Sequence, residues 1–177
     1  MSMRKLSLCL AACALALAAA GAALAEGPNL GKPISPSDLK AWDIFVMPDG
    51  TGLPPGSGTP AQGAAVYKQK CAPCHGENGE GGIAGQLIGG PPRASLDGGK
   101  TIANYYPYAT TIFDYVRRAM PYTAPRSLSD EEVYALTAFL LARNKIIGEN
   151  ETMDAQTLPK VKMPNRDGFI TRFPDRI

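Results

Sequence analysis

The chain is poor in histidine, because His75 is the only one among its 177 residues. A single histidine excludes a catalytic or metal site that needs two imidazoles from the same chain. Cysteine is also scarce: of the four present, Cys9 and Cys13 lie in an apolar N-terminal segment. If that segment is removed, only Cys71 and Cys74 remain, and no structural disulfide can form without using both of them.

The chain has no marked excess of charge of either sign. Its formal net charge is +2, but two of its 18 basic residues, Arg4 and Lys5, lie at the extreme N-terminus. Without these two, 16 basic residues face 16 acidic ones. A near-neutral chain lacks the basic surface that attracts nucleic acids or anionic membranes, so we expect neither as a partner.

Residues 1–25 have the pattern of a secretory signal peptide. Two basic residues precede an apolar stretch over residues 6–17, and Ala23-Leu24-Ala25 forms a small-residue cleavage site. We therefore predict export to the periplasm, with the signal peptide cleaved after Ala25. One alternative is a retained membrane anchor, which the alanine content and the cleavage site disfavour. Another is a lipoprotein signal ending at Cys13, although the apolar run continues beyond it.

The most informative motif is Cys71-Ala72-Pro73-Cys74-His75, a C-x-x-C-H run. This run is the attachment signature for haem c, in which each thiol adds to a vinyl group and the adjacent imidazole binds the iron. The second half of the chain has no further C-x-x-C-H run. We therefore predict one covalent haem c, held by Cys71 and Cys74, with His75 as an iron ligand. Since no second histidine exists, the sixth position is either open or filled by a methionine thioether.

Two other chemistries also use closely spaced cysteines. A structural zinc site normally needs four Cys or His ligands, whereas this motif supplies three, packed too tightly to surround one ion. A thioredoxin-like redox pair shares the C-x-P-C pattern, but it expects a preceding strand within a βαβ unit. Here a helical pattern precedes the motif, and a glycine-rich loop over residues 76–90 follows it. The context therefore favours haem.

Proline and glycine divide the remainder of the chain into three parts. Residues 26–58 are predicted to form an extended, irregular arm, in which Trp42 belongs to the one apolar cluster. We favour a packing role for Trp42 over partner binding. Residues 59–148 form the predicted monohaem domain, and residues 149–177 a polar tail that wraps on its surface. No segment has the convincing alternation of a strand.

Three helices are predicted within the haem domain, so the expected fold class is all-α. Two of them begin at capping boxes, in which two side chains and two backbone N–H groups bind reciprocally. The boxes are Thr59 with Gln62, before a helix over residues 60–71, and Ser129 with Glu132, before a helix over residues 130–143. The remaining helix runs from about Thr110 to Ala119 on the spacing of its apolar residues, and it ends before Met120-Pro121.

The order of these elements resembles the class I cytochrome c fold: helix, C-x-x-C-H, glycine-rich loop, helix, Met-Pro, capped helix. In that family the first and last helices cross, and a loop methionine closes the second face of the haem. The resemblance therefore implies that the helices over residues 60–71 and 130–143 pack together and that Met120 is the sixth iron ligand. Met163, which also precedes a proline, is the main competitor.

The same resemblance implies contacts around the haem. In class I cytochromes a proline carbonyl after the haem-binding loop accepts a hydrogen bond from the iron-bound histidine. Pro91 and Pro92 are the two matches here, and the sequence does not choose between them. Arg93 is a candidate partner for a haem propionate, since a guanidinium fork suits a carboxylate. Further candidates for that contact are Tyr105, Tyr106 and Tyr108.

A closer resemblance extends over most of residues 31–170. Four segments look like those of the cytochrome c subunits that partner molybdenum-containing sulfite or sulfane dehydrogenases, including the cytochrome subunit of the Sox sulfur-oxidation complex. These segments are residues 40–44 (KAWDI), 48–56 (PDGTGLPPG), 105–111 (YYPYATT) and 162–169 (KMPNRDGF). One departure is that the Sox cytochrome subunit carries two haem domains, whereas this chain has one.

The resemblance implies an electron-transfer protein rather than an enzyme. It would accept electrons from a periplasmic molybdenum dehydrogenase and pass them to a downstream cytochrome or oxidase of the respiratory chain. Full ligation by His75 and Met120 leaves no open iron position for a substrate. Two alternatives stay open: a generic diffusible cytochrome c that serves another periplasmic dehydrogenase, and a haem enzyme or sensor whose sixth position is open.

Overall fold

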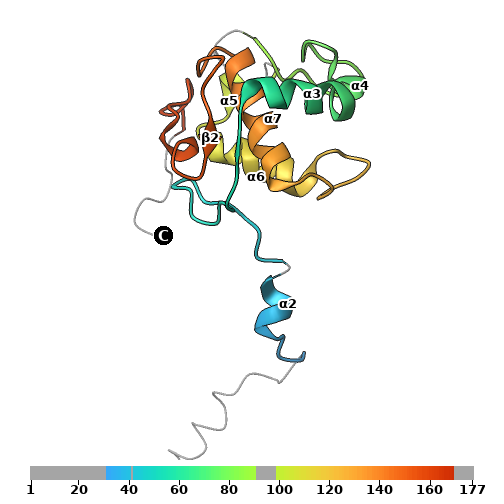
Figure 1. The fold of residues 1–177 in the computed structure, drawn as a ribbon, viewed down its shortest axis with the longest axis vertical. Coiled ribbons are helices and arrows are strands. Elements are labelled where there is room, and N and C mark those ends of the chain that lie inside the picture. The colour runs from blue at the N-terminus through green and yellow to red at the C-terminus, as the bar shows by residue number, and fades with distance from the viewer. Residues whose placement is uncertain (1–30, 41, 91–98, 170–177) are drawn as a thin grey trace, which may run out of the picture. The chain divides into compact units, whose positions relative to one another are not determined.

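The computed structural model describes residues 31–40, 42–90 and 99–169, and the chain divides into two compact units, residues 1–42 and 43–177. The described elements are mostly helical (Figure 1). In chain order they are α2 (Pro36–Lys40), β1 (Ser57–Gly58), α3 (Pro60–Lys70), α4 (Ala72–His75), α5 (Ile102–Tyr105), α6 (Ala109–Ala119), α7 (Asp130–Arg143), β2 (Met153–Asp154) and the 3-10 turn η1 (Leu158–Lys160). The all-α prediction is confirmed, with one addition: β1 and β2 form a short antiparallel pair that the sequence analysis did not predict.

The helices α3 and α7 begin where their capping boxes predicted. The Thr59 hydroxyl accepts the N–H of Gln62, and the Gln62 side chain accepts the N–H of Thr59. Ser129 and Glu132 form the same reciprocal pair at the start of α7. Each box satisfies backbone N–H groups that no helical carbonyl reaches, so it fixes the first turn without tertiary contacts.

The helices α3 and α7 pack against each other, as the class I order implied (Figure 1). Gly63 lies at their closest approach, where an added Cβ would stand 2.0 Å from the Ala135 carbonyl oxygen. The absent side chain lets the two backbones touch. One turn further along, the rings of Tyr67 and Phe139 pack with their centroids 4.9 Å apart. The helix pair is therefore held by a backbone contact and an aromatic contact side by side.

An ion pair closes the end of this helix pair. Lys70 Nζ lies 2.7 Å from Glu132 Oε1, and each side chain is about one-third exposed. The hydrogen bond from Lys70 lowers the pKa of Glu132 below its ordinary value. Because the folded-state pKa is depressed, the pair stabilises the fold above the ordinary glutamate range, and this contribution is lost as the pH falls through the lowered pKa.

The core of residues 43–177 is built mainly on α6 and α7. The rings of Phe113 and Tyr134 are fully buried, with centroids 4.5 Å apart. Full burial of a large apolar side chain contributes about 1.5–3 kcal/mol. The other large buried apolar side chains of these two helices are Ile112, Val133, Leu136, Leu140 and Leu141. The helix predicted from Thr110 to Ala119 is confirmed as α6, which starts one residue earlier.

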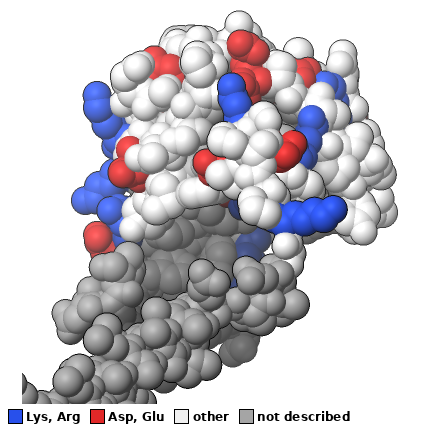
Figure 2. Space-filling model, turned by 90° about the horizontal axis from the view of Figure 1, so that it is seen from below, with Lys and Arg blue, Asp and Glu red and all other residues white. Residues whose placement is uncertain are grey.

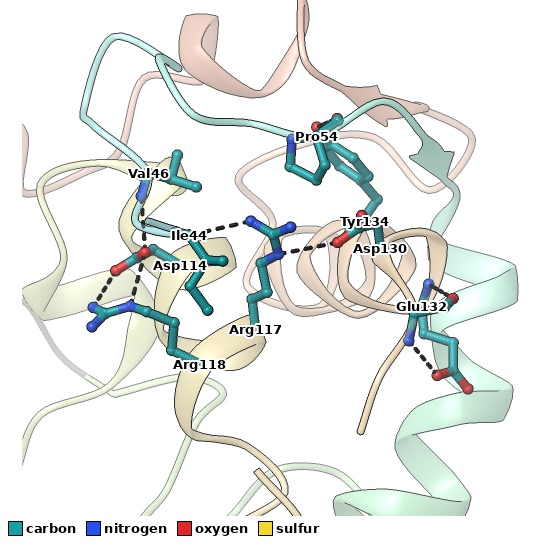
Figure 3. A network of polar contacts seen from close by, with 10 residues as sticks. Ile44, Val46, Pro54, Asp114, Arg117, Arg118, Asp130, Glu132 and Tyr134 are labelled. Atoms are coloured by element: carbon teal, nitrogen blue, oxygen red, sulfur yellow. Dashed lines mark hydrogen bonds and ion pairs between the residues drawn. The ribbon is translucent and has the colours of Figure 1, made fainter. Parts of the chain in front are cut away.

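Residues 43–58, predicted as part of an arm outside the core, instead belong to the same compact unit as α6 and α7. Val46 is 9% exposed, and its N–H donates to Asp114 Oδ1 at 2.9 Å (Figure 3). Arg118 also binds Asp114. This buried carboxylate therefore has both a backbone donor and a cation, which is the pairing that a buried charge requires.

Two further contacts hold the same segment (Figure 3). Arg117 donates to the Ile44 carbonyl oxygen at 3.2 Å and binds Asp130 at 3.1 Å. The Tyr134 hydroxyl donates to the Pro54 carbonyl oxygen at 2.8 Å. These bonds run from helix side chains to backbone carbonyls of the segment. Proline and glycine spacing cannot reveal such bonds, which is why the sequence pattern indicated an extended arm outside the core.

Part of the predicted surface tail is also core. Met153, Leu158 and Met163 are 2%, 0% and 1% exposed. The strand β2 pairs with β1 in the register Gly58 with Met153. The apolar residues of the tail are isolated among polar ones, so no periodicity marked them as buried. The tail therefore adds side chains to the core as well as covering it.

The unit that ends at Trp42 contains α2. The Ser35 hydroxyl accepts the N–H of Asp38 at 3.1 Å, which satisfies one donor of the first turn. Trp42 is 78% exposed. The helix α2 has no buried side chain, so within this unit no apolar face is available to the indole. The packing role favoured for Trp42 stays a prediction, as does partner binding.

Basic and acidic side chains are interspersed over the face shown in Figure 2. Neither sign forms a continuous field on that face, in keeping with the nearly equal numbers of the two kinds in the sequence. Among the residues that the structure describes, no helix combines the length and the apolar composition needed to cross a membrane.

Replacing Gly63 by alanine should destabilise the fold. The added methyl would meet the Ala135 carbonyl oxygen, a backbone atom that cannot move aside cheaply. We expect a loss of about 1–3 kcal/mol from overpacking, which outweighs the gain of up to about 1 kcal/mol that alanine brings to a helix. Chemical denaturation followed by circular dichroism measures it. Gly99→Ala is the matched control, because nothing lies within 4 Å of its added Cβ. Equal stability of the two variants would contradict the close crossing.

Candidate haem-attachment site

The C-x-x-C-H residues lie on a short helical turn that follows α3 directly. Cys71 is both the C-cap of α3 and the N-cap of α4. Its carbonyl oxygen accepts the N–H groups of Cys74 at 3.1 Å and His75 at 3.0 Å. Residues three and four positions apart share one side of a helical turn. The turn therefore gathers both thiols and the imidazole on the same side.

The two thiols are free and half-buried. Burial raises the pKa of Cys71 to about 11, against a smaller opposing effect of Lys70. A redox-active or zinc-binding cysteine works as a thiolate, which a lowered pKa favours. The raised pKa of Cys71 therefore disfavours a redox-active thiolate. It is compatible with addition of the S–H bond across a vinyl group, which forms a thioether.

The glycine-rich loop folds back over the motif through backbone hydrogen bonds. The Gly81 N–H donates to the His75 carbonyl oxygen at 2.8 Å, and the Ala84 N–H donates to the Cys74 carbonyl oxygen at 2.9 Å. Gly76, which ends α4, has a φ of +84°. Glycine adopts this left-handed conformation without strain, so the chain can turn immediately after His75.

Tyr67 joins the helix pair to this loop. Its ring packs on α7, and its hydroxyl donates to the Gly76 carbonyl oxygen at 2.9 Å. Burial raises the pKa of Tyr67 to about 12, so the hydroxyl keeps its proton as a donor. The residue directly after the histidine is thereby tied to α3.

A backbone carbonyl orients the imidazole of His75. Its Nδ1 lies 2.7 Å from the Gly85 carbonyl oxygen. A carbonyl only accepts hydrogen bonds, so Nδ1 carries the proton and Nε2 presents its lone pair, as an iron ligand must. The resemblance implied Pro91 or Pro92 as the acceptor, and that assignment stays a prediction; among the described residues, the Gly85 carbonyl oxygen is the partner of Nδ1. Pro91, Pro92 and Arg93 lie outside the described residues. No side chain marks Gly85, so only the loop conformation reveals it.

Met120 is half-buried at the end of α6, where its N–H donates to the Val116 carbonyl oxygen at 3.1 Å. The competitor Met163 is 1% exposed and packs in the core, as does Met153 at 2%. A methionine in such a position acts as a core filler whose thioether is covered by protein. The burial therefore favours Met120 over Met163, and ligation by Met120 stays a prediction.

The residues present fit a haem c. Two free thiols and an imidazole with an available Nε2 lie on one side of a short turn, and a half-buried thioether ends α6. Cys71 and Cys74 would hold the porphyrin, and His75 and Met120 the iron. When bound, the haem supplies a ferric–ferrous couple, for which methionine ligation favours a relatively positive potential.

The tyrosines considered for the propionates have other contacts. Tyr105 packs against Tyr106 and Phe169, with centroids 5.5 Å and 5.7 Å away. Arg166 lies 4.1 Å above the ring of Tyr108. Tyr108 and Arg166 also line a cavity of about 270 Å³, to which no residue of the C-x-x-C-H motif contributes. A role of these tyrosines toward a propionate stays a prediction.

Comparisons with known proteins agree with this site. The family of cytochrome c oxidase, cbb3-type, subunit III matches residues 58–140. A chain in the crystal structure of the sulfane dehydrogenase SoxCD from Paracoccus pantotrophus is 38% identical, with a TM-score of 0.75 over 85% of this chain and 75% of that chain. Thiosulfate dehydrogenase from Allochromatium vinosum is 26% identical over 133 residues, which are 74% of this chain and 45% of that protein.

The mostly helical fold and its C-x-x-C-H turn, together with these matches, define a class I-like c-type cytochrome. The chain belongs to the cytochrome c family. The predicted resemblance to cytochromes of sulfur-compound dehydrogenases is confirmed by the similarity to SoxCD and to thiosulfate dehydrogenase. The chain spans less than half the length of the thiosulfate dehydrogenase that it resembles.

Replacing Cys71 or Cys74 by serine should leave the protein with one thioether in place of two, and with less attached haem. A hydroxyl does not add to a vinyl group under the same conditions. Mass spectrometry of the denatured protein and the spectrum of its pyridine complex measure the linkage. Ala72→Ser is the control, because it changes a spacer residue of the motif and leaves both thiols and His75 in place. Two thioethers in both single variants would disprove the attachment scheme.

Replacing Met120 by alanine should leave haem attached but open its sixth position. Exogenous cyanide or carbon monoxide should then bind readily, and the reduction potential should fall by on the order of 0.1 V, a part of the ~0.8 V range that axial ligands span. Ligand titration and a redox titration test this. Met163→Ala should instead cost about 2–5 kcal/mol of stability through a core cavity. If only Met163→Ala opened the iron, the ligand would have to be reassigned to the tail.

Proposed function

We propose that this chain is a monohaem cytochrome c that accepts single electrons from a molybdenum-containing dehydrogenase of an inorganic sulfur compound, of the sulfite or sulfane type. It passes them to a downstream cytochrome or oxidase of the respiratory chain. The observation that carries the proposal is the oriented C-x-x-C-H turn, with the 38% identity to a chain of the sulfane dehydrogenase SoxCD. The sequence contains one such motif, which supports one haem.

The coordination chemistry supports transfer rather than catalysis. His75 would present Nε2 to one face of the iron, and Met120 is the thioether proposed for the other; its partial burial supports this choice over the buried Met163. An iron with both axial positions filled has no place for substrate, so its remaining reaction is to gain or lose one electron. The protein's task is then to exclude water and keep both ligands in place in the two oxidation states, which lowers the reorganisation that each transfer requires.

Export fits this role. The N-terminal pattern predicts a signal peptide, and c-type haem is attached outside the bacterial cytoplasm. We propose a periplasmic location, where an oxidising dehydrogenase and the respiratory chain can both reach the protein. Basic and acidic side chains are mixed on the face shown in Figure 2, which supports a partner contact there that does not depend on one strongly charged patch.

A second candidate is that the haem itself takes part in the oxidation of a sulfur compound. The similarity to a thiosulfate dehydrogenase favours it, because that relative is named as an enzyme. In that case the iron should be reachable by small ligands in the wild-type protein. Binding of carbon monoxide to the unmodified ferrous protein, without any substitution at Met120, would support this candidate over the carrier.

The proposed donor can be tested by stopped-flow reduction. The oxidised cytochrome is mixed with a purified sulfite or sulfane dehydrogenase and its sulfur substrate, and haem reduction is followed by absorbance. We expect fast reduction that saturates with cytochrome concentration, and no comparable reduction by the sulfur substrate alone. Dithionite serves as the control that shows a competent haem. A haem that dithionite reduces but neither dehydrogenase does would overturn the assignment of the donor.

A further inference from the structure

The side chain of Asn144, at the C-terminal end of α7, forms hydrogen bonds through both its amide oxygen and its amide nitrogen. Its Oδ1 accepts the N–H of Gly89 at 2.9 Å. Its Nδ2 donates to the carbonyl oxygens of Leu87 at 3.3 Å and Leu140 at 2.8 Å. The acceptor faces an N–H and the donor faces carbonyls, so all three contacts agree on one orientation of the amide. Asn144 therefore ties the last helix to residues 87–89 of the glycine-rich loop.

The tied segment is continuous with the carbonyl that orients His75. Gly85, whose carbonyl oxygen lies 2.7 Å from His75 Nδ1, precedes Leu87 by two residues. The N–H groups of Leu87 and Ile88 donate to the Gly79 carbonyl oxygen at 2.9 Å and 3.1 Å. These bonds bring residues 87–88 back to Gly79, so they close a loop that contains Gly85.

Gly85 has no side chain that could hold its carbonyl in place. A Cβ built on Gly85 would meet nothing within 4 Å, and the residue is exposed. Its position is therefore set by the neighbouring residues that are bonded. On the N-terminal side, the N–H of Ala84 donates to the Cys74 carbonyl oxygen. On the C-terminal side, the Leu87 carbonyl oxygen accepts a hydrogen bond from Asn144.

We propose that Asn144 is a positioning residue for the axial histidine. By fixing residues 87–89 on the end of α7, it holds the Gly85 carbonyl where it accepts the Nδ1 proton of His75. The ring orientation and the donor strength of the imidazole then depend on a side chain that touches neither the histidine nor the haem. This inference rests on the proposed role as a haem-bearing electron carrier, in which the hydrogen bond on the second nitrogen tunes the iron.

A purely structural role for Asn144 is the competing explanation. Its bond to the Leu140 carbonyl satisfies one acceptor at the helix end, and that contact alone would affect stability. The two roles differ in what else they change. Loss of a helix cap lowers the melting temperature, whereas loss of the loop tie also alters the histidine and the haem.

The test compares Asn144→Ala with Asn165→Ala in the haem-loaded protein. Asn165 Nδ2 donates to the Tyr105 carbonyl oxygen at 2.7 Å, so its replacement removes a bond of the same kind from another segment. Two quantities are measured: solvent exchange of the His75 Nδ1 proton by NMR, and the reduction potential by spectroelectrochemical titration. The melting temperature is recorded for both variants.

We expect Asn144→Ala to speed the exchange of the His75 Nδ1 proton about fivefold to tenfold, the factor that corresponds to one lost hydrogen bond. Its reduction potential should rise, because an imidazole without the carbonyl acceptor donates less to ferric iron. Asn165→Ala should change neither quantity. Equal falls in melting temperature with unchanged exchange and potential in both variants would overturn the proposal.

A second substitution keeps the test decisive if Asn144→Ala fails to retain haem. Asn144→Asp keeps the acceptor for Gly89 and removes the donors to Leu87 and Leu140, so a smaller change in both quantities is expected. Exchange and potential identical to wild type in Asn144→Asp would count against the positioning role. None of these readouts uses a dehydrogenase, so failure of the proposed electron donor would be seen separately in the stopped-flow experiment.

Discussion

The close packing of α3 on α7 is the contact on which the rest of the haem unit depends. At Gly63 the backbones approach so nearly that a single methyl would stand 2.0 Å from the Ala135 carbonyl oxygen. Cys71 is the C-cap of α3, so the packing of α3 on α7 sets where the attachment turn begins. Asn144 is the C-cap of α7, and its side chain binds the loop whose Gly85 carbonyl orients the imidazole. One helix pair thus places both the chain that carries His75 and the carbonyl that it binds.

The features that could be predicted from the sequence are those with local causes. Capping boxes act within four residues, so Thr59 and Ser129 marked the starts of α3 and α7 to the residue. The C-x-x-C-H run defines its own chemistry, because two thiols and an imidazole at that spacing share one helical turn. The end of α6 at Met120 followed from the proline after it, which disfavours a helical conformation.

The features that could not be predicted depend on contacts between distant residues. Val46 is one of four consecutive apolar residues (residues 44–47), and Met163 stands alone between a lysine and a proline; only their tertiary neighbours make them core. Asp114 reads as an exposed helix residue, yet it binds the N–H of Val46, 68 positions away. The acceptor for His75 is a glycine carbonyl, which no side-chain pattern encodes.

The pairing of β1 with β2 has a consequence for the order in which this protein assembles. Ser57 pairs with Asp154, so the attachment motif and the helices α3, α6 and α7 all lie in sequence between the two paired strands. Closing so long a loop costs more chain entropy than forming a helix, and contacts between distant residues slow folding. We therefore expect the strand pair to form after the helices. Until then the segment that carries both thiols stays within an open chain, where the machinery that links the haem can reach it.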